Sequence, residues 1–447
     1  MYVKRVLPNG VRLITERIDT VRTASVGIWV GNGSRYEPAA LGGISHFIEH
    51  MIFKGTDKRS ARHIAIAIDA LGGQANAFTD KECTCYYMKV LDKRLQTGVS
   101  ILADMFMHSR FAQEDIDLER GVVLEEIDMY EDSPEDVAID KLFEACYAGS
   151  ALGRPILGTA ETLQTINSEA MHDYMRRYYR PADTVVSVSG HFTEEDLDYI
   201  AELFSHMEGE GRNQITPAAY QPSLVLREKE IEQNHLCLSF PGVSLLSEER
   251  FAMNLLSSIL GGGMSSRLFQ SVREQNGLCY SVYTFTTPHL DTGLFSIYTG
   301  LGPETEQKAL ALIVRELHEF CDNGPEPDEL SRCREQVKTN LLMGLESTGT
   351  RMMTIGRSEL LRGEVSAIEQ VLGAYDRVTA DDLLALARVC STFRRPRSPW
   401  SGSQKSRRPT ARCCSNGQPP PRLLTSPLFW YTIHTESKRK RCFVGRE

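Results

Sequence analysis

The chain has 447 residues, a length that exceeds one ordinary hydrophobic core and predicts two or three domains. Its composition, 41% hydrophobic and 24% charged, without a run of eighteen apolar residues, is typical of a globular protein and argues against a membrane-spanning helix. The net charge of −9 conceals an asymmetry: residues 391–447 carry thirteen basic and two acidic side chains, which leaves −20 on residues 1–390. We therefore expect neither a nucleic-acid nor a membrane partner.

The first ten residues show neither the apolar core of a signal peptide nor an Arg- and Ser-rich transit segment. The eleven cysteines are scattered, and the close pairs Cys83/Cys85 and Cys413/Cys414 have neither zinc-finger nor redox spacing. We expect a cytoplasmic protein of bacterial type, with most cysteines as small core residues in a reducing compartment.

Residues 1–35 alternate apolar and polar side chains between glycine-containing turns, which predicts strands. Residues 42–56 instead show apolar side chains at helical spacing, so we expect an amphipathic helix that ends near Gly55.

His46 and His50 are four residues apart in this helix and share one face, from which two imidazoles can reach one metal ion. A catalytic zinc site keeps three protein ligands and an open position. Glu49 stands beside the histidines, where a general base could take a proton from a water on the metal. The order His-x-x-Glu-His is the inverted form of a common zinc-peptidase motif. A pair of satisfied, partly buried histidines is the alternative, and a third ligand is needed to decide.

The helix expected over residues 115–132 carries Glu119 and Glu126 seven residues apart, so both point from the face that also holds Val122 and Val123. Carboxylates on an inward face are costly to bury unless they are paired or bind a cation. We therefore take Glu126 as the third zinc ligand and Glu119 as a supporting residue that orients a ligand or the helix. The alternative is a solvated acidic face.

The second half repeats the plan of the first without the histidine helix: strand, helix, glycine turn, strand and several helices occur twice, which indicates an ancient duplication. Each half is expected to be α+β, a mostly antiparallel sheet with helices packed on one face. We assign residues 1–210 to a zinc-bearing catalytic domain, 211–223 to a linker, 224–390 to a homologous domain without metal, and 391–447 to a basic, Pro-rich tail.

The repeat predicts a closing strand after the helix that ends near Arg388, like the strand expected over residues 184–190 in the first half. Instead the chain enters the tail, which holds seven of the nineteen prolines and should be disordered or poorly docked. The tail is either a basic interaction arm, with Lys438–Arg441 as its most basic run, or out-of-frame sequence without a selected function. The abrupt switch in place of an expected strand favours the second interpretation.

The segment Gly42–Thr56, with Glu126 placed 76 residues beyond His50, resembles the pitrilysin family of zinc peptidases, and in particular bacterial members similar to the mitochondrial processing peptidase β subunit. Asn76-Ala77-Phe78-Thr79 and Arg267-Leu268-Phe269 through Tyr280 also match, so the resemblance covers about residues 1–390. It implies one Zn²⁺ per chain with the following site: ligands His46, His50 and Glu126, base Glu49 and supporting glutamate Glu119.

The resemblance also implies that a peptide substrate adds as a strand to a sheet edge, with Asn76, Ala77 and Phe78 beside the scissile bond. Arg273 and Tyr280 match the family's substrate-binding pair, which the opposing half contributes across a closed cavity. The two domains of this chain together correspond to only one side of that cavity. We therefore expect a homodimer, or a heterodimer with a related subunit, in which the second chain supplies the other side. From the residues alone, the segment around Asn76 could instead be a plain turn before a strand. Arg273 could form a surface salt bridge, and Tyr280 could be a packed strand residue.

We therefore expect a zinc-dependent endopeptidase that hydrolyses short unfolded peptides or presequence-like segments through a metal-activated water. The alternative is a non-catalytic partner or scaffold subunit of a processing-peptidase-like complex. Degenerate ligands would indicate that alternative, whereas all of the ligands are present here.

Overall fold

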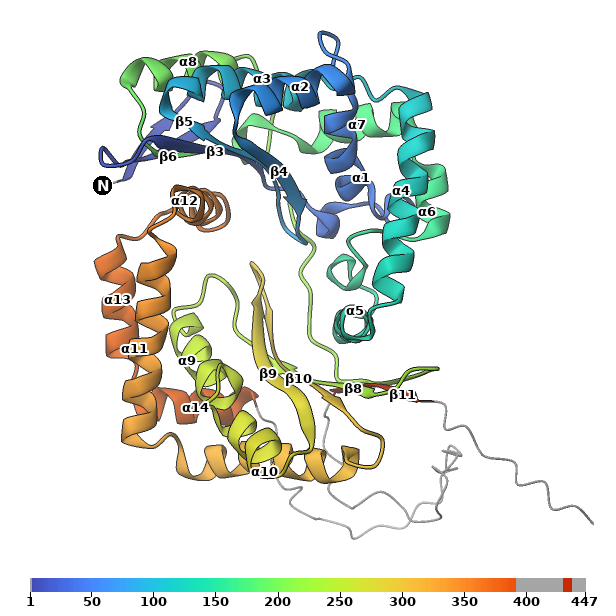
Figure 1. The fold of residues 1–447 in the computed structure, drawn as a ribbon, viewed down its shortest axis with the longest axis vertical. Helices are drawn as coiled ribbons and strands as arrows, with labels where there is room; N and C mark the ends of the chain where they lie inside the picture. The colour runs from blue at the N-terminus through green and yellow to red at the C-terminus, as the bar shows by residue number, and fades with distance from the viewer. Residues whose placement is uncertain (1, 391–428, 436–447) are drawn as a thin grey trace, which may run out of the picture.

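The computed structural model describes residues 2–390 and 429–435, which form two α+β domains arranged along the long axis of the molecule (Figure 1). Each domain is built on one sheet, with six strands in the N-terminal domain and five in the C-terminal domain. The expected α+β class with two domains of sheet and helices is confirmed.

The N-terminal sheet has the order β1-β2-β6-β3-β5-β4, and its neighbouring strands are antiparallel except for the parallel pair β2 and β6. Strand residues alternate between faces, and Val26, Ile28 and Val186 on one face are fully buried in the main core. The strands are β1 (Tyr2–Val6), β2 (Arg12–Arg17), β3 (Thr23–Val30), β4 (Gln74–Thr79), β5 (Thr84–Leu91) and β6 (Thr184–Gly190).

The helices of this domain follow the amphipathic patterns of the sequence, and polar side chains cap several of them, as Ser60 caps α2. The α-helices are α1 (Ile44–Met51), α2 (Ala61–Leu71), α3 (Leu95–His108), α4 (Gln113–Glu131), α5 (Pro134–Cys146), α6 (Ala160–Thr165), α7 (Ser168–Tyr178) and α8 (Glu194–Ser205). Short 3₁₀ turns cover Ser34–Tyr36, Ala39–Leu41, Ile52–Lys54, Asp92–Arg94, Ala151–Gly153 and Pro181–Asp183.

The C-terminal sheet has the order β7-β11-β8-β10-β9, in which β7 and β11 are the parallel pair. Its strands are β7 (Leu224–Lys229), β8 (Asn234–Pro241), β9 (Cys279–Pro288), β10 (Gly293–Leu301) and β11 (Phe429–Thr435). Its helices are α9 (Arg250–Gly261), a π-helix (Phe269–Glu274), α10 (Glu306–Asn323), α11 (Pro327–Gly344), α12 (Thr348–Arg362), α13 (Ile368–Arg377) and α14 (Ala380–Cys390).

Strand β11 corrects the expectation for the tail. It lies between β7 and β8, parallel to the first and antiparallel to the second, as β6 lies between β2 and β3. The closing strand that the repeat demands is therefore present, and 38 residues separate it from Cys390. Residues 429–435 combine aromatic and β-branched side chains, a composition with strong strand propensity that Lys, Arg and Pro elsewhere in the tail obscured. The rest of the tail expectation falls on residues 391–428 and 436–447, outside the described residues.

The two domains exchange a helix. Helix α5 leaves the N-terminal domain to pack on β7, β8 and β11, and α12 leaves the C-terminal domain to pack on β2, β3 and β6 (Figure 1). Each sheet is thus covered on its second face by a helix of the other domain. One apolar cluster joins Val137, Leu142 and Phe143 of α5 to Cys237 and Leu294, and another joins Met352 and Ile355 of α12 to Ile14, Trp29 and Val185.

Two glycines allow α12 to approach the sheet closely. A Cβ atom on Gly356 would lie 2.1 Å from Nε1 of Trp29, and one on Gly27 would lie 2.4 Å from Sδ of Met352. A side chain at Gly356 would collide with the buried Trp29 ring, and one at Gly27 would displace the Met352 side chain.

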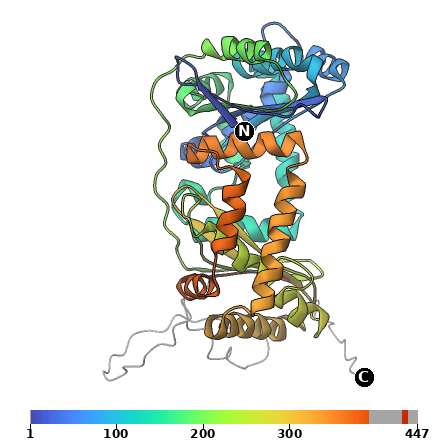
Figure 2. The same cartoon turned by 90° about the vertical axis from the view of Figure 1, so that its left-hand side faces the viewer.

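A buried ionic cluster also ties the domains together. The Arg35 guanidinium lies 2.6 Å from the Glu82 carboxylate and 2.7 Å from that of Asp291, which follows β9. Glu82 in turn accepts the backbone N–H of Leu290 at 3.1 Å. Residues 206–223 connect the domains without regular structure, as the long green trace beside them in Figure 2 shows.

Within residues 2–390 and 429–435, every helix is too short or too polar to cross a bilayer.

Candidate metal centre

Helix α1 is fixed at its start by a carboxylate from outside the helix. Gly43 precedes it with φ 92°, and a Cβ there would lie 2.5 Å from the carbonyl oxygen of Leu157. The buried Glu37 carboxylate accepts the backbone N–H of Gly43 at 2.8 Å and of Ser45 at 2.9 Å. Burial raises the pKa of Glu37 to about 7. The first turn of the helix is thereby held in one position.

Helices α1 and α4 bring three metal-ligating side chains together. His46, His50 and Glu126 each offer a ligand atom within 4.8 Å of the others. Nε2 of His46 and Nε2 of His50 lie 3.6 Å and 3.5 Å from Oε2 of Glu126. The two imidazole centroids are 4.6 Å apart. The convergence on which the sequence interpretation depended is therefore present, while the role of these residues as ligands stays a prediction.

The three donors fit zinc. Bonds of about 2.0–2.2 Å in a tetrahedron separate neighbouring ligand atoms by about 3.3–3.6 Å, and the distances from Oε2 of Glu126 fall within this range. Burial and the neighbouring His50 lower the pKa of His46 to about 4, so its imidazole is neutral at pH 7, the form that binds metal. Nδ1 of His46 is buried and has no hydrogen-bond partner among the described residues.

Glu119 supports the second histidine. Oε1 of Glu119 lies 2.9 Å from Nδ1 of His50, and Oε2 pairs with Nζ of Lys54. A carboxylate at Nδ1 fixes the tautomer whose Nε2 is free to bind a metal. Burial alone would lower the pKa of His50, but Glu126 and Glu119 outweigh it and raise the pKa. This arrangement matches the supporting role inferred for Glu119.

Val122 and Val123 of α4 differ in their exposure to solvent. Val123 is fully buried, whereas Val122 is 51% exposed, so it does not share the inward face as expected. The face of α4 that meets α1 therefore includes Val123 but not Val122. Glu125, which lies next to Glu126, is exposed.

Glu49 belongs to α1, and its side chain reaches the edge strand β4. Its Oε2 accepts a hydrogen bond of 2.6 Å from Oγ1 of Thr79, the last residue of β4. Burial raises the pKa of Glu49, and the bond from Thr79 partly offsets this effect. A carboxylate with a raised pKa, one oxygen held and one free, is suited to accept and return a proton.

The predicted substrate-edge residues lie on β4, the last strand of the sheet, but not on one face. Ala77 packs against the main core, on the side of α1, and Asn76 is exposed. Phe78 instead packs against Trp29 on the opposite face. Alternation along the strand turns Phe78 away from α1, while the place of these three residues beside the scissile bond stays a prediction.

Arg273 and Tyr280 lie in the C-terminal domain, in the π-helix and at the start of β9. The guanidinium of Arg273 stacks over the Tyr280 ring at 4.8 Å and over the Phe269 ring at 4.6 Å. Tyr280 is 76% exposed. Within the described part of the chain, both side chains contact residues of their own domain, so the chain brings the pair together with Tyr280 exposed.

Three residues of the site were missed from sequence. Lys54 falls one turn after His50, a spacing that could have indicated a partner for Glu119. Thr79 ends the matched segment that begins at Asn76, but a hydroxyl gives little signal. Glu37 could have been sought because α1 begins after a glycine with no capping side chain of its own.

Two family models match the chain. One, described as insulinase (peptidase family M16), matches residues 12–160, and the other, described as the peptidase M16 inactive domain, matches residues 165–337. The first covers α1 and α4 with all of the candidate zinc-site residues, and the second covers most of the C-terminal domain.

Curated relatives match over most of their length. The chain is 42% identical over 385 residues to uncharacterized zinc protease YmxG of Bacillus subtilis, which covers 86% of this chain and 94% of that protein. It is 40% identical over 396 residues to an uncharacterized zinc protease of Streptomyces coelicolor, which covers 86% and 85% respectively.

Solved structures share the fold. A peptidase M16 inactive domain from Pseudomonas fluorescens superposes with a TM-score of 0.81 at 20% identity, over 87% of this chain and 94% of that chain. A protease from Helicobacter pylori gives the same TM-score and identity, over 87% and 96%.

Proposed function

Because this chain belongs to the insulinase family of peptidases, family M16, we propose that it is a zinc-dependent endopeptidase that cleaves short unfolded peptides or presequence-like segments. The resemblance to pitrilysin-type zinc peptidases read from the sequence is confirmed at the level of the family. The observation that carries the proposal is the convergence of His46, His50 and Glu126 beside Glu49.

Zinc held by His46, His50 and Glu126 would polarise the scissile carbonyl and acidify a water. Glu49 takes the proton from the attacking water and returns it to the leaving amine. The Thr79 hydroxyl keeps one oxygen of Glu49 in place during both transfers.

The peptide binds as an additional strand along β4. This strand pairs with β5 on one side and ends the sheet on the other, so its outer backbone groups are available for a peptide. Main-chain hydrogen bonds along this edge would fix the register of the peptide, and the contact of Thr79 with Glu49 places the edge next to the catalytic base.

A dimer completes the site. Arg273 stacks on the exposed ring of Tyr280 in the C-terminal domain, which supports a role across an interface with a second chain. In the partner's site, the guanidinium and the phenol would bind substrate carbonyls and stabilise the developing oxyanion.

Peptide cleavage with and without a chelator, measured with the mass in solution, tests the proposal. We expect cleavage of unstructured peptides that is lost with chelator and restored by Zn²⁺. A zinc-loaded chain without turnover on any peptide would support a non-catalytic subunit instead.

Mixing two inactive variants tests the shared site. Glu49→Gln lacks the base and Arg273→Ala lacks the substrate contact, but a mixed dimer contains one site with both residues intact. We expect activity to return on mixing and to follow dimer formation. Mixed dimers that stay inactive would place Arg273 outside the partner's site.

A further inference from the structure

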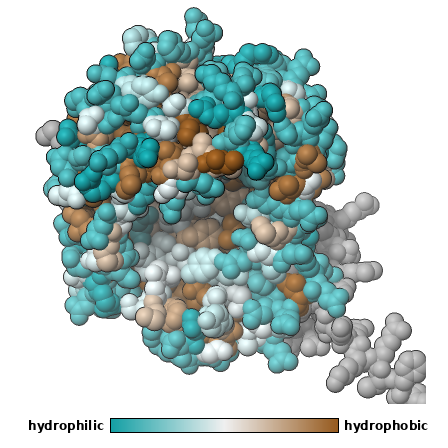
Figure 3. Space-filling view, turned by 45° about the horizontal axis from the view of Figure 1, so that its top comes forward, coloured by the Kyte–Doolittle hydropathy of each residue, from teal (hydrophilic) through white to brown (hydrophobic). Residues whose placement is uncertain are grey.

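A cavity of about 390 Å³ lies between α12 and the edge strand β4. Its walls are Trp29 and Phe78 of the N-terminal sheet, Met353 and Thr354 of α12, and Leu245, which follows β8. Because one water has a share of about 30 Å³ in the liquid, this cavity has room for a large side chain. Figure 3 shows the molecule hollowed between its two domains, with hydrophobic side chains along the upper border of the hollow.

Phe78 connects this cavity to the peptide edge. Along β4, Ala75 and Ala77 pack towards the core under α1 and Thr79 reaches Glu49, whereas Phe78 faces the other side of the sheet. A peptide strand added to β4 has the same alternation, because side chains opposite one another on neighbouring strands point to the same face. Every second side chain of the peptide therefore faces the side of the cavity.

The charges around the cavity favour an aromatic side chain over an acidic one. Three arginines border it, and each already has a carboxylate partner: Arg357 with Asp80 at 3.1 Å, Arg250 with Glu248 at 3.0 Å and Arg362 with Glu364 at 3.0 Å. The three pairs are neutral overall, so they supply no uncompensated positive charge that would attract an acidic side chain. An aromatic ring can stack on a paired guanidinium and on the walls formed by Trp29 and Phe78 without breaking an ion pair.

Building on the peptidase function above, we infer that the cavity between Trp29, Phe78 and α12 is a specificity subsite for an aromatic side chain of the substrate peptide. The side chain comes from a peptide residue on the Phe78 face of the sheet, so α12, a helix of the C-terminal domain, selects substrates that the zinc site of the N-terminal domain cleaves.

Peptide substitution measures the preference. A set of fluorescent ten-residue peptides of one parent sequence, each with phenylalanine in place of alanine at a single position, is cleaved by the zinc-loaded chain. Mass spectrometry locates the cleaved bond, and the Phe-to-Ala ratio of kcat/KM is measured at each position. We expect a ratio of about ten or more at one position on the Phe78 face.

Thr354→Trp fills the cavity from an exposed position on α12. It should lower this ratio about tenfold, towards one. Thr350→Trp is the matched control, since Thr350 is exposed one turn earlier on the same helix and does not line the cavity; it should leave the ratio unchanged.

Binding separates this inference from the peptidase function. Zinc-loaded Glu49→Gln binds the same peptides without turnover, and fluorescence anisotropy gives their Kd. If the parent chain cleaves nothing, the peptidase proposal fails, but a Phe preference in Kd that Thr354→Trp removes would still establish the subsite. An unchanged ratio in Thr354→Trp, the absence of any Phe preference in Kd, or a change in the mass of Thr354→Trp in solution, which would assign the cavity to a second copy, would overturn the subsite.

Discussion

The two domains contain the same helix pair in the same position, but only one pair offers metal ligands. Helices α1 and α4 contact each other beside β4, and α9 and α11 contact each other beside β9. The first pair contributes His46, His50, Glu119 and Glu126, whereas the second contributes Leu255, Leu256, Leu330 and Cys333 to an apolar cluster.

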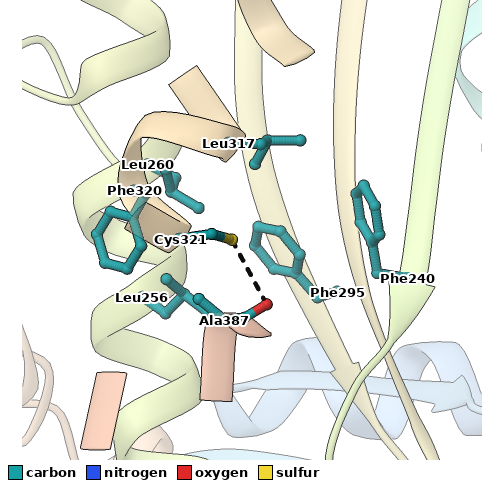
Figure 4. A pocket seen from close by; sticks show the side chains of 8 residues that line it. All are labelled: Phe240, Leu256, Leu260, Phe295, Leu317, Phe320, Cys321 and Ala387. Carbon is teal, nitrogen blue, oxygen red and sulfur yellow. Dashed lines mark hydrogen bonds between the residues drawn. The ribbon is translucent and has the colours of Figure 1, made fainter. Parts of the chain in front are cut away.

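The C-terminal core around α9 is apolar. A cavity of about 20 Å³ beside α9 is lined by Phe240, Leu256, Leu260, Phe295, Leu317, Phe320, Cys321 and Ala387, as Figure 4 shows, and these residues include no His, Asp or Glu. The only polar contact drawn there joins Sγ of Cys321 to the carbonyl oxygen of Ala387 at 3.8 Å. A contact between two helices thus occurs once with side chains that could ligate a cation and once with apolar side chains.

Replacing one candidate zinc ligand should leave α1 and α4 without bound zinc, as α9 and α11 are expected to be. His50→Ala or Glu126→Gln should reduce zinc from about one per chain to near none and eliminate turnover, because two remaining ligands bind zinc weakly. Elemental analysis after dialysis measures this loss. Glu125→Gln, on the exposed face of α4, is the matched control and should keep its zinc. Full zinc content in His50→Ala would refute the ligand set.

Removing only the base should separate metal binding from chemistry. Glu49→Gln should retain zinc and lower kcat by about 10²–10⁴, the range of a general base. Steady-state kinetics with parallel zinc analysis tests this outcome. Wild-type turnover in a zinc-loaded variant would show that Glu49 is not the base.

Weakening the apolar pair should affect stability but not zinc. Leu255 is fully buried in α9, and Leu255→Ala should lower the free energy of unfolding by about 2–5 kcal/mol through lost burial and a new cavity. Urea unfolding gives the change, and zinc content is the control. Zinc lost in proportion to stability would mean that the metal site depends on the C-terminal core.

The first turns of α1 and α9 differ in whether a titratable side chain holds them, so we expect only α1 to contribute a pH-dependent stability. Glu37 holds the first turn of α1, whereas α9 begins at Glu249 without a side-chain cap. Burial raises the pKa of Glu37 from 4.5 to about 7, so its ionised form is disfavoured in the folded state. The stability associated with the protonated carboxyl is present below pH 4.5 and is lost as pH rises to about 7.

Glu37→Gln removes this titration. In chelator-treated protein, the free energy of unfolding of the wild type minus that of the variant should decline between pH 4.5 and 7 and stay level above pH 7. Urea unfolding at several pH values measures the difference. A difference that is constant with pH would assign an ordinary pKa to Glu37.

The smallest effect is expected from the supporting carboxylate. Glu119→Gln should weaken zinc binding about 10–100-fold, because Nδ1 of His50 loses a charged partner, without preventing zinc binding at saturating metal. Competition with a chelator gives the affinity. Lys54→Met tests the other contact of Glu119, and a larger loss there than in Glu119→Gln would make Lys54 the main determinant.

The sequence predicted several elements and the convergence of three side chains because both depend on helix and strand spacing. The strand expected over residues 184–190 occurs with these bounds, and the side chains of His46, His50 and Glu126 converge as expected. These relations need only the geometry of one helix and one contact between helices.

Contacts between distant segments were not predictable in the same way. Periodicity shows that α12 has an apolar face but not that a sheet of the other domain covers it, and Glu37 reaches α1 through a turn that no repeat marks. The motif match placed Phe78 on the peptide edge but did not specify which face of the sheet its side chain occupies. The strand at residues 429–435 was hidden by the composition around it.

The exchange of α5 and α12 constrains how such a molecule could originate. In a single ancestral unit with one sheet, the second face of that sheet would have been exposed. It would have been covered only if two units packed together and each placed one helix on the sheet of the other. If duplication produced this chain, its ancestor was a symmetric pair of identical subunits before fusion. Fusion of the two subunits into one chain then retained an interface that had already formed between them.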